Sequence, residues 1–446
     1  MNFTAWRENF VDHHFLYHIL LVPFVWLGNG LYAVKLSAVF FPAIFITIWY
    51  WFWREQGNKQ ALLFTLLPLL NEALTFRLAL VKANSLSLIF LLLVFFALQK
   101  NKNKLLAVLC FLYVWAYGGW VIAPLAVGLW CLIFWQRKLK KIRPLFYALA
   151  GTLLGLIINP YFPANLNFYW LQIVDIGLIN HVQDLNAGRE WYPYAFSTLV
   201  SIHALYFAVL TIILVACRKD WCRISRRSIF YSALALIGFL LAWKSMRYIE
   251  LSVPLVILAF GSLWQDLLPN FSWSKLTNNF WQSTGKINRR LRWYAGIIFL
   301  ILLPLAGFYL VFNLARPRIN MLAGFPLTAY QQEALWLAEH TPEKSIIVHS
   351  DWGEWPELFY YNTHNHYIVG LDPTFMYRYD PQLFRQWADF TMNKSTQDPR
   401  QIMEKLQSEY LLVSFSHAGL IKTIDQNTDF ETIFIGTRAK IYQLKN

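Results

Sequence analysis

The sequence predicts a polytopic α-helical membrane protein that ends in an α/β domain. Hydrophobic residues make up 57% of the 446 residues and charged residues only 14%, whereas soluble domains carry about 25% charged residues. Apolar runs suited to crossing a bilayer recur up to residue 315. Beyond that point the composition is globular, and predicted helices alternate with short buried strands. The chain therefore divides into a transmembrane domain, 1–315, and a second domain, 316–446.

About ten transmembrane helices are predicted, because a spanning helix needs roughly 20 apolar residues. The candidate spans are 30–53, 60–76, 83–99, 104–118, 119–136, 144–159, 195–216, 228–243, 248–266 and 293–314. A tight turn at 117–120 separates the fourth span from the fifth. This pair is also compatible with a single re-entrant feature.

Basic residues between the spans give the predicted orientation. Alternate links hold 20 of the 39 lysines and arginines. These links contain Arg54 and Lys59; Lys100, Lys102 and Lys104; Arg137, Lys138, Lys140, Lys141 and Arg143; Arg218, Lys219, Arg223, Arg226 and Arg227; and Lys275, Lys286, Arg289, Arg290 and Arg292. Because cytoplasmic links are enriched in Lys and Arg, these links are predicted to be cytoplasmic. Loops 1–29 and 160–194 and the domain 316–446 then lie outside the cytoplasm, on a cytoplasmic (inner) membrane.

The same distribution excludes two other classes of protein. The net charge of +14 follows from membrane orientation, so membrane lipids are predicted partners and nucleic acid is not. The four cysteines, Cys110, Cys131, Cys217 and Cys222, lie in or beside apolar segments or basic links. A disulfide framework is therefore not predicted.

Ionisable residues that interrupt the apolar pattern are predicted to face the exoplasm together. They are Asp12, Glu72, Arg77, Lys82, Asp175, His181, Asp184, Arg189, Glu190, Lys244, Arg247 and Glu250. Charged groups at membrane depth are costly and usually line a cavity or a pathway. We therefore expect one shared site on this side of the membrane.

The first of these residues lies in the stretch VDHHFLYH, directly before an apolar run. Asp12 at this position is compatible with a catalytic base, a metal ligand or a helix N-cap. His14 and His18 are four residues apart and share a helical face that would suit a metal, but no matching Cys, Glu or His set lies nearby. An aromatic position at the membrane interface is the expected role of at least two of His13, His14 and His18.

Four cations on the exoplasmic side are candidates for binding a phosphate. They are Arg77, Lys82, Lys244 and Arg247. Arginine binds phosphate through a bidentate fork, and lysine binds it as a point charge. The alternatives are an ion pair between Glu72 and Arg77 and another between Arg247 and Glu250, three residues apart.

The exoplasmic loop 160–194 contributes two predicted features. Its centre, 168–179, is amphipathic and aromatic, which favours a helix along the membrane surface. Its end, GREWYPY, places Arg189 and Glu190 beside three aromatic residues. Aromatic faces next to hydrogen-bonding groups suit sugars and phosphates, whereas an interfacial loop with a snorkelling Arg189 is the alternative.

The C-terminal domain is predicted to be an α/β layer sandwich. Predicted helices cover 328–340, 354–362 and 399–408, and predicted strands cover 345–350, 366–370 and 410–414, followed by a strand pair around ETIFIG and AKIYQL. DPTFMYRYDPQLF is predicted to be a membrane-facing or substrate-facing loop. No Gly-rich nucleotide fingerprint follows a strand. Asp351, Trp352 and Glu354 follow the end of the first strand, where α/β proteins tend to bind ligands.

Together these features resemble the GT-C superfamily of membrane glycosyltransferases. The resemblance is carried by VDHHFLYHILLVPF, NPYFPANL, GREWYPY and MRYIELSVP, followed by the exoplasmic α/β domain, and it covers most of the chain. The DWGEW segment after a strand loosely resembles the tryptophan–glycine motif of oligosaccharyltransferase catalytic subunits. That motif lacks the full acceptor-recognising pattern here, so protein N-glycosylation is not implied. The membrane helix expected ahead of the acidic loop is missing from this sequence, which implies a chain that starts late or a different topology.

The resemblance implies a sugar donor linked to polyprenyl phosphate or pyrophosphate, and a lipid, glycan or protein acceptor outside the cytoplasm. It implies that Asp12 is a base or metal ligand, and that Arg77, Lys244 and Arg247 are candidates for binding the donor phosphate. A divalent metal, Mg²⁺ or Mn²⁺, is the one cofactor left open. An inverting transfer of a hexosyl or pentosyl group needs a base for the acceptor hydroxyl and positive charge for the leaving phosphate.

The complete set of candidate site residues has three parts. Asp12 and His13 are catalytic candidates; Arg77, Lys82, Lys244 and Arg247 are phosphate-binding candidates; His14, His18, Arg189, Glu190, Asp351, Trp352 and Glu354 are substrate-binding candidates. Two other functions compete with a transferase. A flippase or transporter of lipid-linked glycans predicts inverted repeats and broken helices at the membrane midplane, and we find no repeat. A non-catalytic glycan-assembly protein would use the same charged residues for binding alone.

Overall fold

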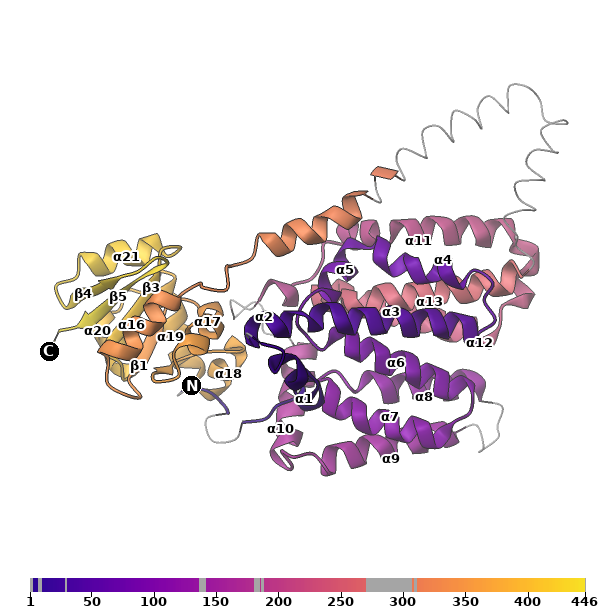
Figure 1. The fold of residues 1–446 in the computed structure, drawn as a ribbon, viewed down its shortest axis with the longest axis horizontal. Helices are drawn as coiled ribbons and strands as arrows, with labels where there is room; N and C mark the ends of the chain where they lie inside the picture. The colour runs from indigo at the N-terminus through magenta and orange to yellow at the C-terminus, as the bar shows by residue number, and fades with distance from the viewer. Residues whose placement is uncertain are drawn as a thin grey trace, which may run out of the picture. The chain divides into compact units, whose positions relative to one another are not determined.

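The computed structural model describes residues 3–6, 10–28, 30–135, 142–179, 185, 188–269, 307–308 and 311–445, and Figure 1 shows the ribbon. The chain forms two compact units. The membrane unit comprises Asp12–Tyr169 and Tyr192–Ala323, and the α/β unit comprises Met1–Val11, Trp170–Trp191 and Gly324–Asn446. His181 and Asp184, predicted above to face the exoplasm, lie outside the described residues.

The membrane unit is helical throughout its described part. Its elements are α1 (Phe15–Val25), α2 (Gly30–Lys35), α3 (Ser37–Glu55), α4 (Ala61–Leu66), η1 (Leu67–Leu70), α5 (Glu72–Leu78), α6 (Asn84–Gln99), α7 (Asn103–Ala116), α8 (Ile122–Phe134), α9 (Arg143–Ile157), α10 (Ala164–Trp170), α11 (Phe196–Ala216), η5 (Arg218–Arg223), α12 (Arg226–Lys244), η6 (Met246–Tyr248) and α13 (Ile249–Leu267). The long helices α3, α11, α12 and α13 lie along a common direction (Figure 1).

These helices confirm a multi-pass membrane protein. Within the described residues, four stretches are long and apolar enough to span a membrane: Gly30–Glu55, Phe196–Val215, Arg226–Lys244 and Met246–Leu267. A bent pair, Ala61–Leu70 and Glu72–Leu78, makes a fifth if it is one span, and five shorter apolar helices accompany them. Nine of the ten predicted spans correspond to helices. The tenth, 293–314, lies mostly outside the described residues.

Small residues let the helices of the membrane unit approach closely. A Cβ at Gly151 of α9 would lie 2.0 Å from the backbone oxygen of Ala107 in α7, and a Cβ at Gly261 of α13 would lie 2.3 Å from the Trp53 ring. Membrane helices associate largely through such close backbone packing, since lipid supplies little hydrophobic driving force. The apolar window of α13 is 83% buried, so this helix is the core of the unit.

A sharp bend between η1 and α5 brings polar residues into the membrane unit. The two halves of the pair meet at 85°. Asn71 stabilises the bend, because its side chain accepts a hydrogen bond from the Leu74 amide at 3.0 Å and donates one to the Ile202 carbonyl at 3.0 Å. Irregular backbone at membrane depth requires such internal partners. The bend positions Glu72 and Arg77 on α5.

The α/β unit is built on a five-stranded mixed sheet in the order β2-β1-β3-β5-β4. Its elements are η3 (Leu171–Ile179), η4 (Arg189–Trp191), α16 (Gln331–His340), β1 (Ile346–His349), η7 (Trp352–Glu354), α17 (Trp355–Tyr361), β2 (His366–Tyr367), α18 (Pro373–Tyr379), α19 (Pro381–Thr391), α20 (Pro399–Lys405), β3 (Tyr410–Ser414), α21 (Ala418–Asp425), β4 (Phe430–Ile435) and β5 (Ala439–Leu444). β1 is parallel to both β2 and β3, whereas β5 is antiparallel to β3 and β4.

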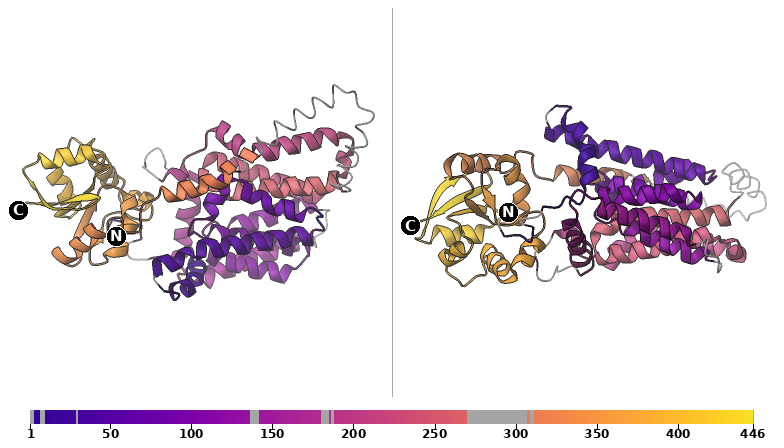
Figure 2. Two further views of the ribbon diagram at one scale, coloured as in Figure 1. Left: turned by 45° about the horizontal axis from the view of Figure 1, so that its top comes forward. Right: turned by 90° about the horizontal axis from the view of Figure 1, so that it is seen from below.

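Helices cover both faces of this sheet, as the two views of Figure 2 show. Successive residues of a strand point to opposite faces. Val348 and Leu411 accordingly belong to the core shared with α18–α21, whereas Ile347 and Leu412 belong to the core shared with α16 and α17. The predicted α/β layer sandwich is therefore confirmed.

The segment DPTFMYRYDPQLF forms two helices, α18 and α19, so its prediction as a loop was wrong. Asp372 accepts a hydrogen bond from the Thr374 amide and Asp380 accepts bonds from the Gln382 and Leu383 amides, each at 2.9 Å. In both helices a proline follows the capping aspartate at the first helical position. Asp-Pro is a helix-start signal, since Asp caps free amides and Pro needs no amide partner there.

Candidate functional site

Asp12 lies immediately before α1 and has both carboxylate oxygens engaged. Oδ2 is 2.6 Å from Nδ1 of His18, one turn into the helix, and Oδ1 accepts a hydrogen bond from the His14 amide at 2.9 Å. Burial raises the pKa of Asp12, but the hydrogen bond and charge of His18 and the His14 amide outweigh it, so the pKa lies below 3.8. Asp12 is therefore an ionised carboxylate, 12% exposed, in a fixed position.

His13 and His14 stack against aromatic rings of other elements. The His13 ring lies 5.1 Å from Phe168 of α10, and the His14 ring lies parallel to Tyr117 at 5.6 Å. Desolvation and the nearby charge of Arg247 lower the pKa of His13 to about 4, so the ring is neutral at pH 7. Nε2 of His14 is buried and has no hydrogen-bond partner among the described residues.

A buried ion pair lies beside the histidines. Nη2 of Arg77 is 2.7 Å from Oε2 of Glu250, and the side chains are only 8% and 7% exposed. The Tyr117 hydroxyl donates to the other oxygen, Oε1, at 2.9 Å. Arg77 therefore pairs with Glu250, whereas Glu72 accepts a hydrogen bond from Asn320 at 3.0 Å. Neither of the two ion pairs considered from the sequence is the one observed.

The other candidate cations, Lys82, Lys244 and Arg247, differ in their exposure and in which residues near Asp12 their charges act on. The positive charge of Arg247, in η6, acts on His13, His14 and Tyr117, and that of Lys82 acts on His14. Lys82 and Lys244 are exposed, and Arg247 is half-buried. The carboxylate of Asp12 also acts on His13. Asp12 and Arg247 thus both lie close enough to influence one imidazole ring.

The other predicted site residues belong to the α/β unit, where they form a cluster of their own. Asp351 and Glu354 make a reciprocal helix cap: Asp351 Oδ1 accepts from the Gly353 amide at 2.7 Å, and Glu354 Oε2 accepts from the Asp351 amide at 3.1 Å. Burial raises the pKa of Glu354 to about 8. A Cβ at Gly188 would lie 3.4 Å from the Trp352 ring, so the segment with Arg189 and Glu190 passes beside Trp352.

The fold of most of the chain is similar to that of a solved structure. The crystal structure of ArnT from Cupriavidus metallidurans bound to undecaprenyl phosphate is similar with a TM-score of 0.52 at 15% sequence identity, over 96% of this chain and 86% of ArnT. The chain has the GT-C fold. No family model and no curated protein sequence matches it. The GT-C resemblance predicted from the sequence is confirmed as a matter of fold.

The Asp12 cluster of this GT-C fold does not fit a metal ion. Both oxygens of Asp12 are engaged with protein hydrogen-bond donors, and His14 stacks flat on Tyr117. In the part of the chain that the structure describes, no three His, Cys, Asp or Glu side chains are grouped to hold a metal.

The sequence did not predict that Tyr117 and Gly118 contact the histidines of this site. Tyr117 and Gly118 belong to the segment between α7 and α8, which was predicted as a tight turn or part of a re-entrant feature, without a role in the site. A Cβ at Gly118 would lie 2.7 Å from Cδ2 of His13, so glycine leaves room for that ring. The signal available was the pair of glycines between aromatic residues, which permits a close approach of another side chain.

Proposed function

We propose that this protein is a membrane glycosyltransferase that moves a hexosyl or pentosyl group from a polyprenyl-phosphate-linked donor to a lipid, glycan or protein acceptor. One observation carries the proposal: the ionised Asp12 and the cationic Arg247 both act on His13, although they lie 235 positions apart in the chain. A base and a cation at one place are what sugar transfer from a phosphate requires. The GT-C fold, found also in ArnT bound to undecaprenyl phosphate, supports this choice of donor.

Asp12 is the proposed base. Its carboxylate is ionised at neutral pH because His18 and the His14 amide stabilise the charge. The acceptor hydroxyl loses its proton to Asp12 while its oxygen attacks the anomeric carbon. The bond from that carbon to the donor phosphate oxygen breaks, and the electron pair leaves with the phosphate. His18 holds the carboxylate in place during proton transfer.

Arg247 and Lys82 are the proposed partners of the donor phosphate, and Lys244 lies at the end of the neighbouring helix α12. Their positive charge would stabilise the leaving phosphate. Arg77 has a different part, since its ion pair with Glu250 fixes α5 against α13. The buried Nε2 of His14 has no hydrogen-bond partner among the residues that the structure describes and is suited to a substrate hydroxyl.

The proposal is tested by sugar transfer in membranes that contain the protein. Tritiated hexosyl and pentosyl polyprenyl phosphates are supplied, and label is counted in the lipid, glycan and protein fractions. Asp12→Asn should lower transfer by about 10²–10⁴-fold, the usual contribution of a positioned base. Asp220→Asn, on a predicted cytoplasmic link, is the matched control. Equal transfer by Asp12→Asn and wild type would remove Asp12 from the mechanism, and donor binding without transfer would indicate a non-catalytic protein.

The proposed location is a cytoplasmic membrane with the α/β unit outside. Native Cys222 is exposed and lies on a predicted cytoplasmic link, whereas Thr396 is exposed in the α/β unit. In intact spheroplasts a membrane-impermeant maleimide should label Thr396→Cys and not Cys222. Labelling of Cys222 before permeabilisation would mean that the orientation is the opposite one and that Asp12 is not on the exoplasmic side.

A further inference from the structure

The helix that carries Phe168 continues from the membrane unit into the α/β unit. η3 follows α10 directly and extends the helix to Ile179 without a break. Phe168 lies against the His13 ring at 5.1 Å, whereas Trp170–Trp191 belongs to the α/β unit. The position of η3 therefore affects the packing of a histidine in the candidate site.

The conformation of η3 depends on contacts with other elements. It is a π-helix of nine residues, and π-helices are rare, usually only a single turn long and frequent at functional sites. One side of η3 is buried through Leu171, Asp175, Ile176 and Gly177. Asp175 is the charged residue of this helix, so its carboxylate has to be stabilised where η3 packs on the α/β unit.

Arg378 of α18 stabilises that carboxylate. Its Nη2 donates to Oδ1 of Asp175, which lies 203 positions earlier in the chain. The side chain of Asp175 is 9% exposed and that of Arg378 is 41% exposed. A carboxylate with so little access to water needs a charged or hydrogen-bonding partner in the protein. The ion pair therefore fixes η3 to α18 within the α/β unit.

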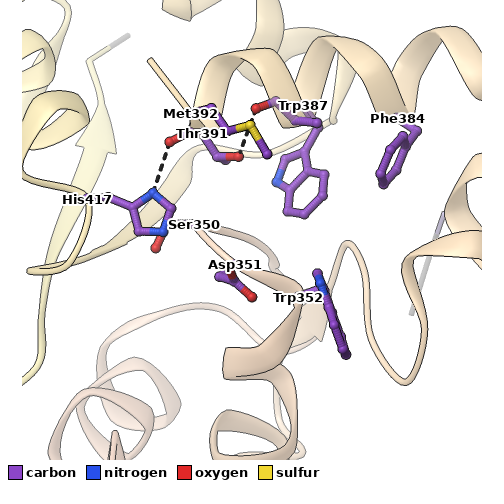
Figure 3. A pocket seen from close by; sticks show the side chains of 9 residues that line it. Ser350, Asp351, Trp352, Phe384, Trp387, Thr391, Met392 and His417 are labelled. Carbon is purple, nitrogen blue, oxygen red and sulfur yellow. Dashed lines mark hydrogen bonds between the residues drawn. The ribbon is translucent and has the colours of Figure 1, made fainter. Parts of the chain in front are cut away.

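The chain after η3 is attached to the same unit by two apolar contacts. Leu185 is buried in the core that also contains Val348 and Phe384. Gly188 passes the Trp352 ring so closely that a Cβ would lie 3.4 Å from it. In Figure 3 the Trp352 ring lies below Phe384. Arg378 thus fixes the helical part of a segment whose far end is already held by packing.

The other end of the continuous helix is fixed in the membrane unit. The Tyr169 hydroxyl donates to the Val114 carbonyl at 2.9 Å. Phe168 and Asp175 are seven positions apart, which is roughly 10 Å at the rise of an α-helix. Because a helix is stiff over two turns, a displacement of Asp175 moves Phe168 relative to His13.

We propose that Arg378 is a positioning residue for sugar transfer: it holds η3 through Asp175, and the continuous helix then keeps Phe168 against His13. This inference rests on the proposed function, since His13 is the ring on which the charges of Asp12 and Arg247 act. Arg378 acts through Asp175, so its role is positioning and not catalysis.

Hydrogen exchange of the full chain in lipid nanodiscs tests the attachment without any assay of activity. Arg378→Gln and Asp175→Asn should each speed exchange of the 164–179 amides at least tenfold, and the double variant should speed it no further, because both remove one ion pair. Arg378→Lys keeps the charge and should retain most of the protection. Arg400→Gln is the matched control, since it breaks an ion pair of the α/β unit with Asp429 and should leave these amides unchanged.

Sugar transfer then tests the path from Arg378 to His13. Arg378→Gln should lower kcat at least tenfold, because a misplacement of about 1 Å can cost roughly 10²-fold in rate. The KM for the donor should stay nearly unchanged, since the proposed phosphate partners lie outside η3. Phe168→Ala should have a similar effect, and Arg378→Gln should add little to it, because both act on one contact. A general loss of folded protein would instead multiply with the Phe168→Ala loss.

Wild-type exchange of the 164–179 amides in Arg378→Gln, or losses of transfer that multiply with Phe168→Ala, would overturn the proposal. Wild-type protein without any transfer would refute the proposed reaction, whereas the exchange pattern would separately establish or refute the attachment of the helix by Arg378. Thermal unfolding and the exchange of β3 and β5 identify a variant that misfolds. Arg378→Lys then decides the outcome, because it should restore both the protection and kcat, and its failure to restore them would also overturn the proposal.

Discussion

Arg77 and Glu250 lie 173 positions apart in the sequence and form a buried ion pair in the membrane unit. Arg77 belongs to the short helix after the 85° bend, and Glu250 begins the buried helix α13. Because Tyr117 donates to the second oxygen of Glu250 and also stacks on His14, the pair connects the core of the bundle to the candidate site.

Removing one member of this pair should destabilise the protein strongly. Arg77→Ala leaves the carboxylate of Glu250 buried without its partner, and such losses cost about 3–5 kcal/mol. The apparent melting temperature of the purified protein in detergent should therefore fall sharply. The double variant Arg77→Met, Glu250→Leu should recover most of it, because both charges are then gone.

Lys100→Ala is the control for this prediction. It breaks a pair with Glu55 in which the side chains are 45% and 40% exposed, and exposed pairs contribute only about 0–1 kcal/mol. Similar melting temperatures for Arg77→Ala and Lys100→Ala would mean that the Arg77–Glu250 pair contributes little to stability.

His18 should control the pH dependence of the proposed transfer. Its hydrogen bond and charge lower the pKa of Asp12, whereas burial alone raises it. The ionised carboxylate is the active form, so activity is lost as pH falls through this pKa. His18→Ala should therefore move the acid limb of the kcat/KM profile to higher pH.

His18→Asn provides the matched comparison, since its amide nitrogen can donate at the position of Nδ1 without carrying a charge. Its acid limb should lie between those of wild type and His18→Ala. Coincident profiles for all three proteins would show that His18 does not act on the catalytic carboxylate.

Much of the fold could be predicted because hydropathy and turn residues act locally. The spans and the strands of the α/β unit follow from apolar runs of characteristic length. The helices α18 and α19 were missed because prolines and aromatic residues were interpreted as a loop, although Asp372 and Asp380 each precede a proline and cap a helix. The capping chemistry was present in the sequence, but the aromatic composition was given more weight.

The site could be predicted only in part, for a physical reason. Sidedness alone indicated that Asp12 and Arg247 share one face, and both charges act on His13. The pairing of Arg77 with Glu250 could not be inferred, because each has a nearer oppositely charged neighbour in the sequence, Glu72 and Arg247. Which pair forms depends on the bend at Asn71 and on the packing of α5 against α13, neither of which is encoded by spacing.

Gly151 should be intolerant of any side chain. A Cβ there would lie 2.0 Å from the backbone oxygen of Ala107, so α7 and α9 would have to separate. Overpacking usually costs about 1–3 kcal/mol, and a backbone contact leaves no flexible side chain to move aside. Gly151→Ala should lower the melting temperature clearly. In Gly128→Ala the new Cβ meets only the Leu145 side chain at 4.0 Å, and equal effects of the two substitutions would contradict this packing argument.

Glu354 should make the α/β unit less stable as pH rises. Burial raises the pKa of its carboxyl to about 8 in the folded state, from an ordinary 4.5. Because its pKa is higher in the folded state than in the unfolded state, Glu354 contributes fully to the free energy of unfolding below pH 4.5. This contribution is lost as pH rises toward 8. Burial of His349 acts in the opposite direction, since its pKa falls to about 4 and its contribution is lost as pH drops below 6.5. Glu354 therefore accounts for the loss of stability at alkaline pH, and His349 accounts for the loss of stability at acid pH.

Hydrogen exchange of the β1 and β3 amides in the full chain separates the two groups. Glu354→Gln can still accept from the Ser350 hydroxyl or the Asp351 amide but cannot ionise. Protection of these strands, corrected for intrinsic exchange, should fall between pH 6 and pH 9 in wild type and stay nearly constant in Glu354→Gln. The control Glu404→Gln, exposed on α20, should retain the wild-type decline. Glu354→Gln removes the ionisable carboxyl that contacts Ser350 and Asp351. A decline of the same size in this variant would therefore mean that another group titrates.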